Sequence, residues 1–173
     1  MTLEDPDVTA FDWSSFPAGQ EARLELVPEM IRDALRVLED LLDAMNHACT
    51  FSLQEGSLTN DDVPASIGAL LPSHCWVERL EPVSSWTELT REALPGLFIP
   101  WRPQEAWTRG SAPRELAEAT TDWTVALLGR LWPASAESWS VVVETRGWYV
   151  GAYVDLAVRV TDRIWLLHLG VTD

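Results

Sequence analysis

Lysine is absent from this chain of 173 residues, and all 12 basic residues are arginine. Asparagine and isoleucine are also scarce, which is the pattern that GC-rich coding produces. We therefore assign the missing lysine to genome composition. Its physical consequence is that every cation is a planar guanidinium, which stacks on aromatic rings and binds carboxylates with two hydrogen bonds.

Cysteines and long apolar runs are scarce as well. The two cysteines, Cys49 and Cys75, are too few to staple a secreted scaffold, so we expect a reduced protein. The longest apolar stretches span only a few residues, which excludes a membrane-spanning helix. The N-terminal sequence has neither the basic nor the apolar region of a secretory signal. These absences predict a cytoplasmic protein that does not enter a membrane.

Sequence motifs for familiar chemistry are missing. There is no phosphate-binding loop, no GxGxxG pattern, no HExxH zinc motif and no EF-hand loop. His47 with Cys49, and His74 with Cys75, offer donor types that zinc accepts, but neither pair has the spacing of a zinc knuckle. We expect buried free cysteines, with no metal and no cofactor.

Tryptophan and negative charge, in contrast, are abundant: the chain has ten Trp residues and a formal net charge of −15. Residues 1–62 contain 14 Asp and Glu against three Arg, a net charge of −11, so the negative field is concentrated there. Such a field attracts basic molecules, and no basic stripe is present to bind phosphates. We expect a basic protein partner and no direct contact with nucleic acid.

The sequence predicts an acidic, flexible arm over residues 1–19 and a single α+β domain over residues 20–173. Apolar residues at steps of three and four predict a helix over residues 28–47. Its opposite face carries Glu29, Asp33, Arg36, Asp40 and Asp43. Residues 47–56 fit either a continuation of this helix or a strand, and periodicity does not decide between them.

The middle of the chain is interrupted by Pro and Gly. One short helix at most fits residues 58–73, and a strand is expected over residues 75–80. Ser85 and Glu88 have capping-box spacing, which predicts a short helix that ends before Pro95.

A second long helix is expected over residues 113–131, halted by Pro133. Its apolar face should contain Leu116, Trp123, Leu127 and Leu131. The connection over residues 95–113 is rich in Pro and Trp and contains Trp101, Arg102 and Trp107. Long loops of this kind often serve function, so we count these three residues as candidates for binding.

Residues 139–170 alternate apolar and polar side chains, which predicts an antiparallel β-meander. A two-residue turn at 146–147 would place Trp139 opposite Val154, with Trp148 also on the buried face. The same face should receive one side of the helix over 113–131, so Trp123 is expected to be buried there.

The second hairpin of the meander should turn at residues 161–162. This register places Leu156 opposite Leu167 and Val158 opposite Trp165. Both hairpin registers collect the large apolar residues on one face of the sheet.

The other face of the meander should be polar. Its members would be Ser140, Glu144, Tyr149, Tyr153, Asp155, Arg159 and His168. His168 falls directly opposite Asp155, and an Asp that orients a His occurs in many acid–base sites. Ser140 lies two strands away from His168, about 10 Å, which is too far for a Ser–His–Asp triad. We rank catalysis by Asp155, His168 and Tyr153 below ligand or partner binding, and both below a plain solvated or helix-covered face.

The expected fold is α+β, with N-terminal and central helices packed on a C-terminal antiparallel β-meander. A compact, acidic, Trp-rich chain without catalytic motifs matches an inhibitor of the immunity or antitoxin type, bound to a basic effector such as a nuclease toxin. The predicted binding residues are Trp13, Glu29, Asp33, Asp40, Asp43, Trp101, Arg102 and Trp107. The alternatives are a small-molecule-binding protein or enzyme that uses the polar sheet face, and a structural adaptor that oligomerises. The sequence does not fix the oligomeric state.

Overall fold

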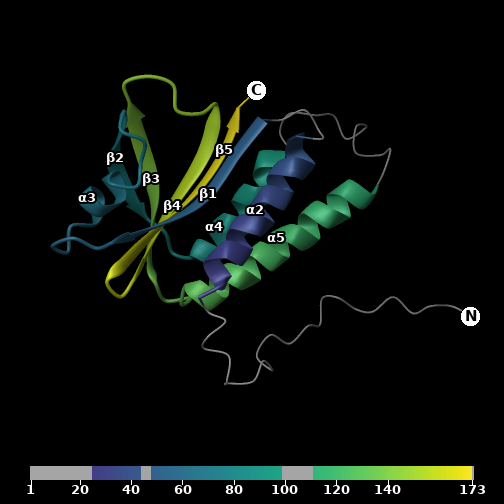
Figure 1. The fold of residues 1–173 in the computed structure, drawn as a ribbon, viewed down its shortest axis with the longest axis horizontal. Coiled ribbons are helices and arrows are strands. Elements are labelled where there is room, and N and C mark those ends of the chain that lie inside the picture. Colours follow the sequence, from purple (N-terminus) through teal and green to yellow (C-terminus); the bar gives the residue numbers. More distant parts are fainter. Residues whose placement is uncertain (1–24, 44–47, 99–110, 173) are drawn as a thin grey trace, which may run out of the picture.

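The computed structural model describes residues 25–43, 48–98 and 111–172. Over these ranges the elements are α2 (Val27–Asp43), β1 (Ala48–Ser57), α3 (Val63–Gly68), β2 (Cys75–Pro82), α4 (Trp86–Phe98), α5 (Ser111–Leu131), β3 (Glu137–Thr145), β4 (Ala152–Val160) and β5 (Arg163–Thr172). The strands form one antiparallel sheet in the order β1-β5-β4-β3-β2, and α2, α4 and α5 lie together on one face (Figure 1). The α+β prediction is confirmed. Within the described ranges, every helix is too short or too polar to cross a membrane.

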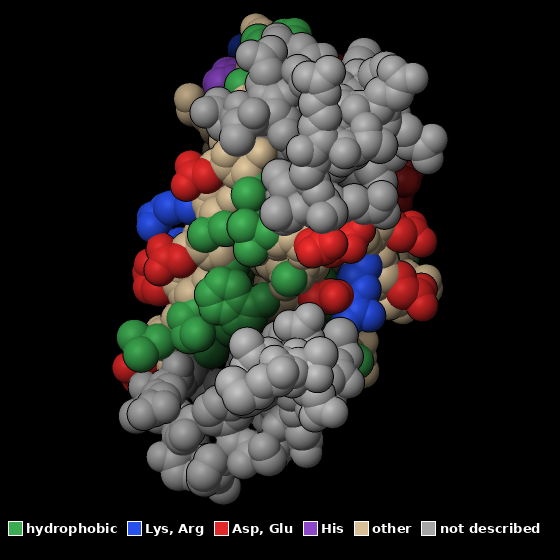
Figure 2. Space-filling view, turned by 90° about the vertical axis from the view of Figure 1, so that its right-hand side faces the viewer, with side chains coloured by type: hydrophobic (Ala, Val, Ile, Leu, Met, Phe, Trp, Pro, Cys, Tyr) green, Lys and Arg blue, Asp and Glu red, His purple; other side chains and the backbone are tan. Residues whose placement is uncertain are grey.

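Helix α2 has the amphipathic character that its sequence predicts. Ile31, Leu35 and Leu38 point inward and are buried, whereas Asp33 and Asp40 are exposed. Figure 2 views the side of the molecule on which α2 and α5 lie, and shows Asp and Glu side chains along both of its margins. The helix is therefore held by burial of one apolar stripe, while its acidic side remains in contact with solvent.

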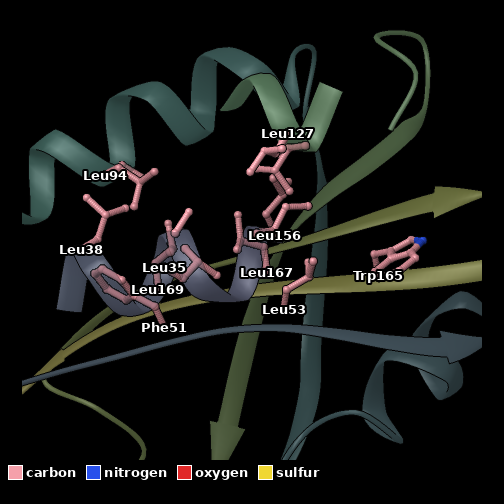
Figure 3. Close-up of a cluster of buried hydrophobic side chains, with 14 of the residues drawn as sticks. Leu35, Leu38, Phe51, Leu53, Leu94, Leu127, Leu156, Trp165, Leu167 and Leu169 are labelled. Carbon is pink, nitrogen blue, oxygen red and sulfur yellow. The ribbon is translucent and has the colours of Figure 1, made fainter. Parts of the chain in front are cut away.

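The larger core lies between these helices and the sheet (Figure 3). Leucines from all three helices meet apolar side chains from β1, β4 and β5. The labelled members are Leu35, Leu38, Phe51, Leu53, Leu94, Leu127, Leu156, Trp165, Leu167 and Leu169. The side chains of β4 and β5 on this face alternate with residues of the opposite face, as strands require.

Residues 48–57 form an edge strand, which settles the choice that periodicity left open between helix and strand. Two long side chains of α2 reach its backbone. The guanidinium Nε of Arg32 donates to the carbonyl oxygen of Leu53 at 3.1 Å, and a carboxylate oxygen of Glu39 accepts from the N–H of Phe51. These bonds satisfy backbone groups that have no neighbouring strand on that side.

The hairpin of β4 and β5 has the predicted register. Leu156 lies opposite Leu167, Asp155 opposite His168, and the turn consists of two residues. Thr161 adopts φ = 54°, the left-handed conformation that glycine usually supplies in such a turn. The tight turn leaves no room for a register shift.

The predicted register of β3 and β4 is wrong. Trp139 lies opposite Ala157 instead of Val154, and the pairing ends at Ser140 and Leu156. The shift of three residues is odd, so β3 presents the opposite face to the one expected. Ser140, opposite Leu156, therefore lies on the helix-covered face, not on the polar face with Asp155.

A side chain replaces the missing part of the β3–β4 ladder. The hydroxyl of Tyr153 accepts a hydrogen bond from the N–H of Val143 at 3.2 Å and donates to its carbonyl oxygen at 3.4 Å. The connection between the strands spans residues 146–151 instead of the two-residue turn predicted at 146–147. The Tyr153 ring thus occupies the space in which a paired strand would lie.

A smaller core lies on the second face of the sheet, under α3. It contains Ile67, Leu71, Cys75, Val141, Ala157, Ile164 and Leu166. Helix α3 begins where Asp62 accepts a hydrogen bond from the N–H of Ala65 at 3.0 Å, as an N-cap does. The expectation of one short helix in this segment is confirmed.

Two helix predictions need correction. The N–H of Glu88 donates to the Ser85 hydroxyl at 3.2 Å, as the capping box predicts, but α4 continues through Pro95 to Phe98. The helix lacks one backbone hydrogen bond at this point, because Pro95 has no N–H to donate. In α5, Leu116 is exposed instead of buried.

Threonines occupy much of the buried side of α5. Thr121 and Thr124 are buried, and their hydroxyls donate to the backbone carbonyls of Ala117 and Thr120 at 2.8 Å. A hydroxyl that is satisfied within its own helix can face a core, so this buried side does not follow the spacing of the large apolar residues.

Candidate functional site

The polar cluster predicted on the meander exists in part. His168 Nδ1 lies 2.6 Å from Asp155 Oδ1, and the Tyr149 hydroxyl donates to Asp155 Oδ2 at 2.8 Å. Asp155 and His168 come from neighbouring strands, whereas Tyr149 reaches them from the connection after β3. Since the carboxylate only accepts, His168 Nδ1 carries the proton of this bond.

This Tyr149–Asp155–His168 network is enclosed. Asp155 is 1% exposed and His168 is 7% exposed. Burial, and next the negative charge of Asp155, raise the pKa of Tyr149 above its ordinary value, so the hydroxyl remains a donor. The Tyr149 ring packs edge-on against Tyr153 with centroids 5.0 Å apart. The Asp155 carboxylate therefore has two donors, the His168 Nδ1–H and the Tyr149 hydroxyl.

The His168 ring lies across Gly170, two residues further along β5. A Cβ atom at Gly170 would stand 2.7 Å from His168 Nε2, closer than real contacts allow. Glycine at this position is therefore what lets the imidazole lie flat along the strand. Ser140 belongs to the other face, so the described geometry brings no Ser140–His168 pair together.

The acidic side of α2 lies where it was predicted. Glu29, Asp33 and Asp40 are exposed, and Arg36 pairs with Asp33 at 2.7 Å. Asp43 occupies the last position of the helix, and its side chain lies outside the description. Both members of the Arg36–Asp33 pair are more than 60% exposed, and such pairs contribute little to stability.

Apolar side chains interrupt this acidic surface. Leu26, Met30 and Val37 are 56%, 39% and 40% exposed, and Leu116 on α5 is also exposed. Figure 2 shows hydrophobic side chains gathered in a band across this side of the molecule, with acidic groups on either margin. We call Leu26, Met30, Val37 and Leu116 the apolar band. Exposed apolar groups that are gathered together with a charged rim mark interaction sites.

No protein-family model, curated protein or solved structure matches this chain. Its surfaces and side-chain chemistry are therefore the basis for assigning a function.

Several predicted binding residues lie outside the described part of the chain. They are Trp13, Trp101, Arg102 and Trp107. The predicted arm over residues 1–19 lies outside it as well.

Sequence reasoning missed an exposed aromatic cluster at the far end of β2 and β3. Trp148, predicted to be buried, is 69% exposed because it belongs to the connection after β3, not to a strand. The guanidinium of Arg146 lies 5.7 Å from the centre of the Trp76 ring, whose N–H donates to Glu144 at 3.0 Å. Arg146 is two residues from Trp148 in the sequence, but the ring that its guanidinium lies over is that of Trp76. Among the other Trp residues expected on buried faces, Trp165 is buried, and Trp123 and Trp139 are partly buried.

One shallow depression of about 470 Å³ lies beside the turn of β4 and β5. Its lining is Pro133, Ser135, Ala136, Glu137, Arg159, Val160 and Thr161. Arg159 already pairs with Asp61 at 2.7 Å and with Glu137 at 3.5 Å, so its charge is neutralised locally. Cys49 and Cys75 lie on the two opposite edge strands of the sheet, too far apart to share a metal ion.

Proposed function

We propose that the protein is an acidic binding protein that neutralises a basic effector, in the manner of an immunity protein or antitoxin. The observation that carries the proposal is the coincidence, on one side of the molecule, of exposed carboxylates with the apolar band. The carboxylates supply long-range attraction to a basic surface, and the apolar side chains supply contacts that exclude water.

The local ion pairs of α2 suit this role. Arg32 pairs with Glu29 and Arg36 with Asp33, and all four groups belong to the same helix. Exposed pairs of this type are worth about 0.2–1 kcal/mol, so an Arg or Lys of a partner can replace them at small cost. Asp40 has no ion pair among the described residues. Of the exposed carboxylates Glu29, Asp33 and Asp40, it is therefore the one most available to a basic group of a partner.

A nuclease is a suitable class of effector. A protein that binds nucleic acid must present basic side chains to phosphates. An acidic protein that covers those side chains competes directly with the substrate, and one copy for each effector is sufficient. No catalytic step is needed from the inhibitor.

The rival functions receive less support from the described residues. Asp155 and His168, on which a pocket or an enzyme would depend, are buried and bonded to each other and to Tyr149. A structural adaptor that oligomerises would have to bring together copies that each carry a net charge of −15, and this charge opposes self-association.

The proposal is tested on the products of the reading frames that flank the gene. Each product is purified, and its binding to the full chain is measured at about 50 and 300 mM salt. One basic product should bind, and its association rate should fall about tenfold or more with added salt. The triple variant Glu29→Gln, Asp33→Asn, Asp40→Asn should weaken the complex about 10- to 100-fold, chiefly through slower association.

A matched control removes equal charge elsewhere. Glu78, Glu81 and Glu144 are exposed on the β2–β3 side, so the corresponding triple Gln variant should bind as the wild type does. Equal loss in both triple variants would show a dispersed field instead of a surface on α2. The proposal would be contradicted if the affinity changed neither with salt nor in the α2 triple variant. It would also be contradicted if no basic flanking product bound.

A further inference from the structure

Five exposed residues of α2 follow a seven-residue repeat. Leu26, Met30, Asp33, Val37 and Asp40 are separated by alternating steps of four and three residues. The N–H of Met30 donates to the carbonyl oxygen of Leu26 at 3.0 Å, so Leu26 shares the helical geometry. Steps of four and three place all five side chains along one stripe, with the spacing of a coiled-coil seam.

The contacts of α2 with its neighbours locate this seam. Ile31 and Leu38 face the core, and Arg32 and Glu39 reach β1 on one flank. Each seam residue directly precedes a residue of the core-facing stripe of α2. The seam side chains therefore project on the flank of the helix that is opposite to β1. Helix α5 packs against α2 and carries the exposed Leu116.

The seam alternates in chemistry as well as in spacing. Leu26, Met30 and Val37 are apolar, whereas Asp33 and Asp40 are acidic and lie seven residues apart. In a helix, seven residues correspond to about 10.5 Å along the axis. A facing helix offers side chains at the same interval. Side chains on one face of a strand recur at about 6.7 or 13 Å and do not match it.

We propose, resting on the function proposed above, that the basic partner docks an amphipathic helix along this seam, beside α5. Apolar residues of the partner helix contact Leu26, Met30 and Val37. Two Arg or Lys residues, seven positions apart, face Asp33 and Asp40. The seam extends from Leu26 to Asp40, a rise of about 21 Å, so the docked helix has about 15 residues. Met30, which has an unbranched and flexible side chain, adapts to the exact shape of the partner.

The test uses two synthetic peptides of 18 residues with identical composition and net positive charge. The seam peptide places Leu at seam positions and Arg at two of them, seven residues apart. In the scrambled peptide the same residues lack this periodicity. Fluorescence anisotropy with the full chain should show the seam peptide binding at least tenfold more tightly, and circular dichroism should show it becoming helical.

Exposed positions allow variants that preserve the fold. Met30→Asp and Val37→Asp should each abolish the preference for the seam peptide. Trp148→Asp alters a residue that is more exposed but lies far from α2, and should leave the preference intact. Thermal melts of all three variants establish that each is folded before binding is compared.

The possible failures are distinguishable. If both peptides bind equally and weaken together with salt, the acidic surface proposed above stands and the helical docking mode is overturned. If neither binds at about 50 mM salt, both the docking mode and its electrostatic basis are overturned. If the Met30 and Val37 variants instead convert a dimer to a monomer in light scattering, a second copy occupies the seam and the proposal is wrong.

Discussion

The face of the sheet under α2, α4 and α5 and the face near α3 are both buried, but their contents differ. The first contains a large cluster dominated by apolar side chains. The second contains a smaller apolar cluster and, beside it, the buried Tyr149–Asp155–His168 network. Apolar burial is insensitive to the exact pairing of side chains, whereas a hydrogen-bonded network is satisfied in one register only. The first face therefore supplies stability, and the second specifies how the strands align.

The largest effect should come from the first face. Leu38 is fully buried among α2, β1 and α4, and Leu38→Ala should lower the free energy of unfolding by about 2–5 kcal/mol. Val37→Ala, one residue away but exposed, should change it by less than about 0.5 kcal/mol. Urea denaturation measures both. Similar values for the two variants would mean that this face is not the source of stability.

Removal of the buried carboxylate should have a smaller but more specific effect. Asp155→Ala removes the shared acceptor of the Tyr149 hydroxyl and the His168 N–H, and leaves them only each other at 3.1 Å, which should cost about 2–3 kcal/mol in the free energy of unfolding. In this variant, the rate of amide hydrogen exchange should increase more in β4 and β5 around the site than in α5. Asp155→Asn retains one acceptor oxygen, so it should lower the free energy of unfolding by less than Asp155→Ala does. Uniform exchange across the molecule would refute a role in strand alignment.

The smallest effect should appear only at alkaline pH. Burial and Asp155 raise the pKa of Tyr149 above 10.0, so the folded chain retains a proton that the unfolded chain releases. Stability should therefore fall as the pH rises above about 10. Tyr149→Phe has no such proton, and its stability should decline less steeply. Urea denaturation at pH 8 and at pH 10.5 compares the slopes, and parallel slopes would show that Tyr149 does not contribute.

The same contrast explains which features the sequence could predict. The β4–β5 register follows from the alternation in β4, where Leu156 lies between Asp155 and Ala157, and from the tight turn. In β3, Val141, Val142 and Val143 are apolar on both faces, so alternation does not distinguish one register from another. The hydroxyl of Tyr153, which replaces the missing ladder, is a long-range contact that no local pattern encodes.

The candidate surface was predictable in a similar, partial way. The exposed acids of α2 follow from helical periodicity, because the opposite stripe is strongly apolar. The apolar band does not follow from periodicity, because Met30, four residues before the buried Ala34, fits the spacing of the inward stripe, and Leu116 was expected on the buried face of α5. Both lie at the margin of an apolar stripe, where a rotation of the helix by a fraction of a turn decides between burial and exposure. Trp148 was misplaced together with the β3–β4 register.

The contacts from Arg32 and Glu39 to the backbone of β1 have a consequence for behaviour at high concentration. An edge strand with unpaired N–H and C=O groups is a template on which another molecule can add a strand and begin aggregation. The two side chains of α2 occupy such groups at Phe51 and Leu53, in the middle of the strand. At the other edge, β2 has a bulge at Glu78 and ends in Pro82. Both edges of this sheet are therefore poor templates for pairing with a second copy, so the chain should resist edge-to-edge aggregation at high concentration.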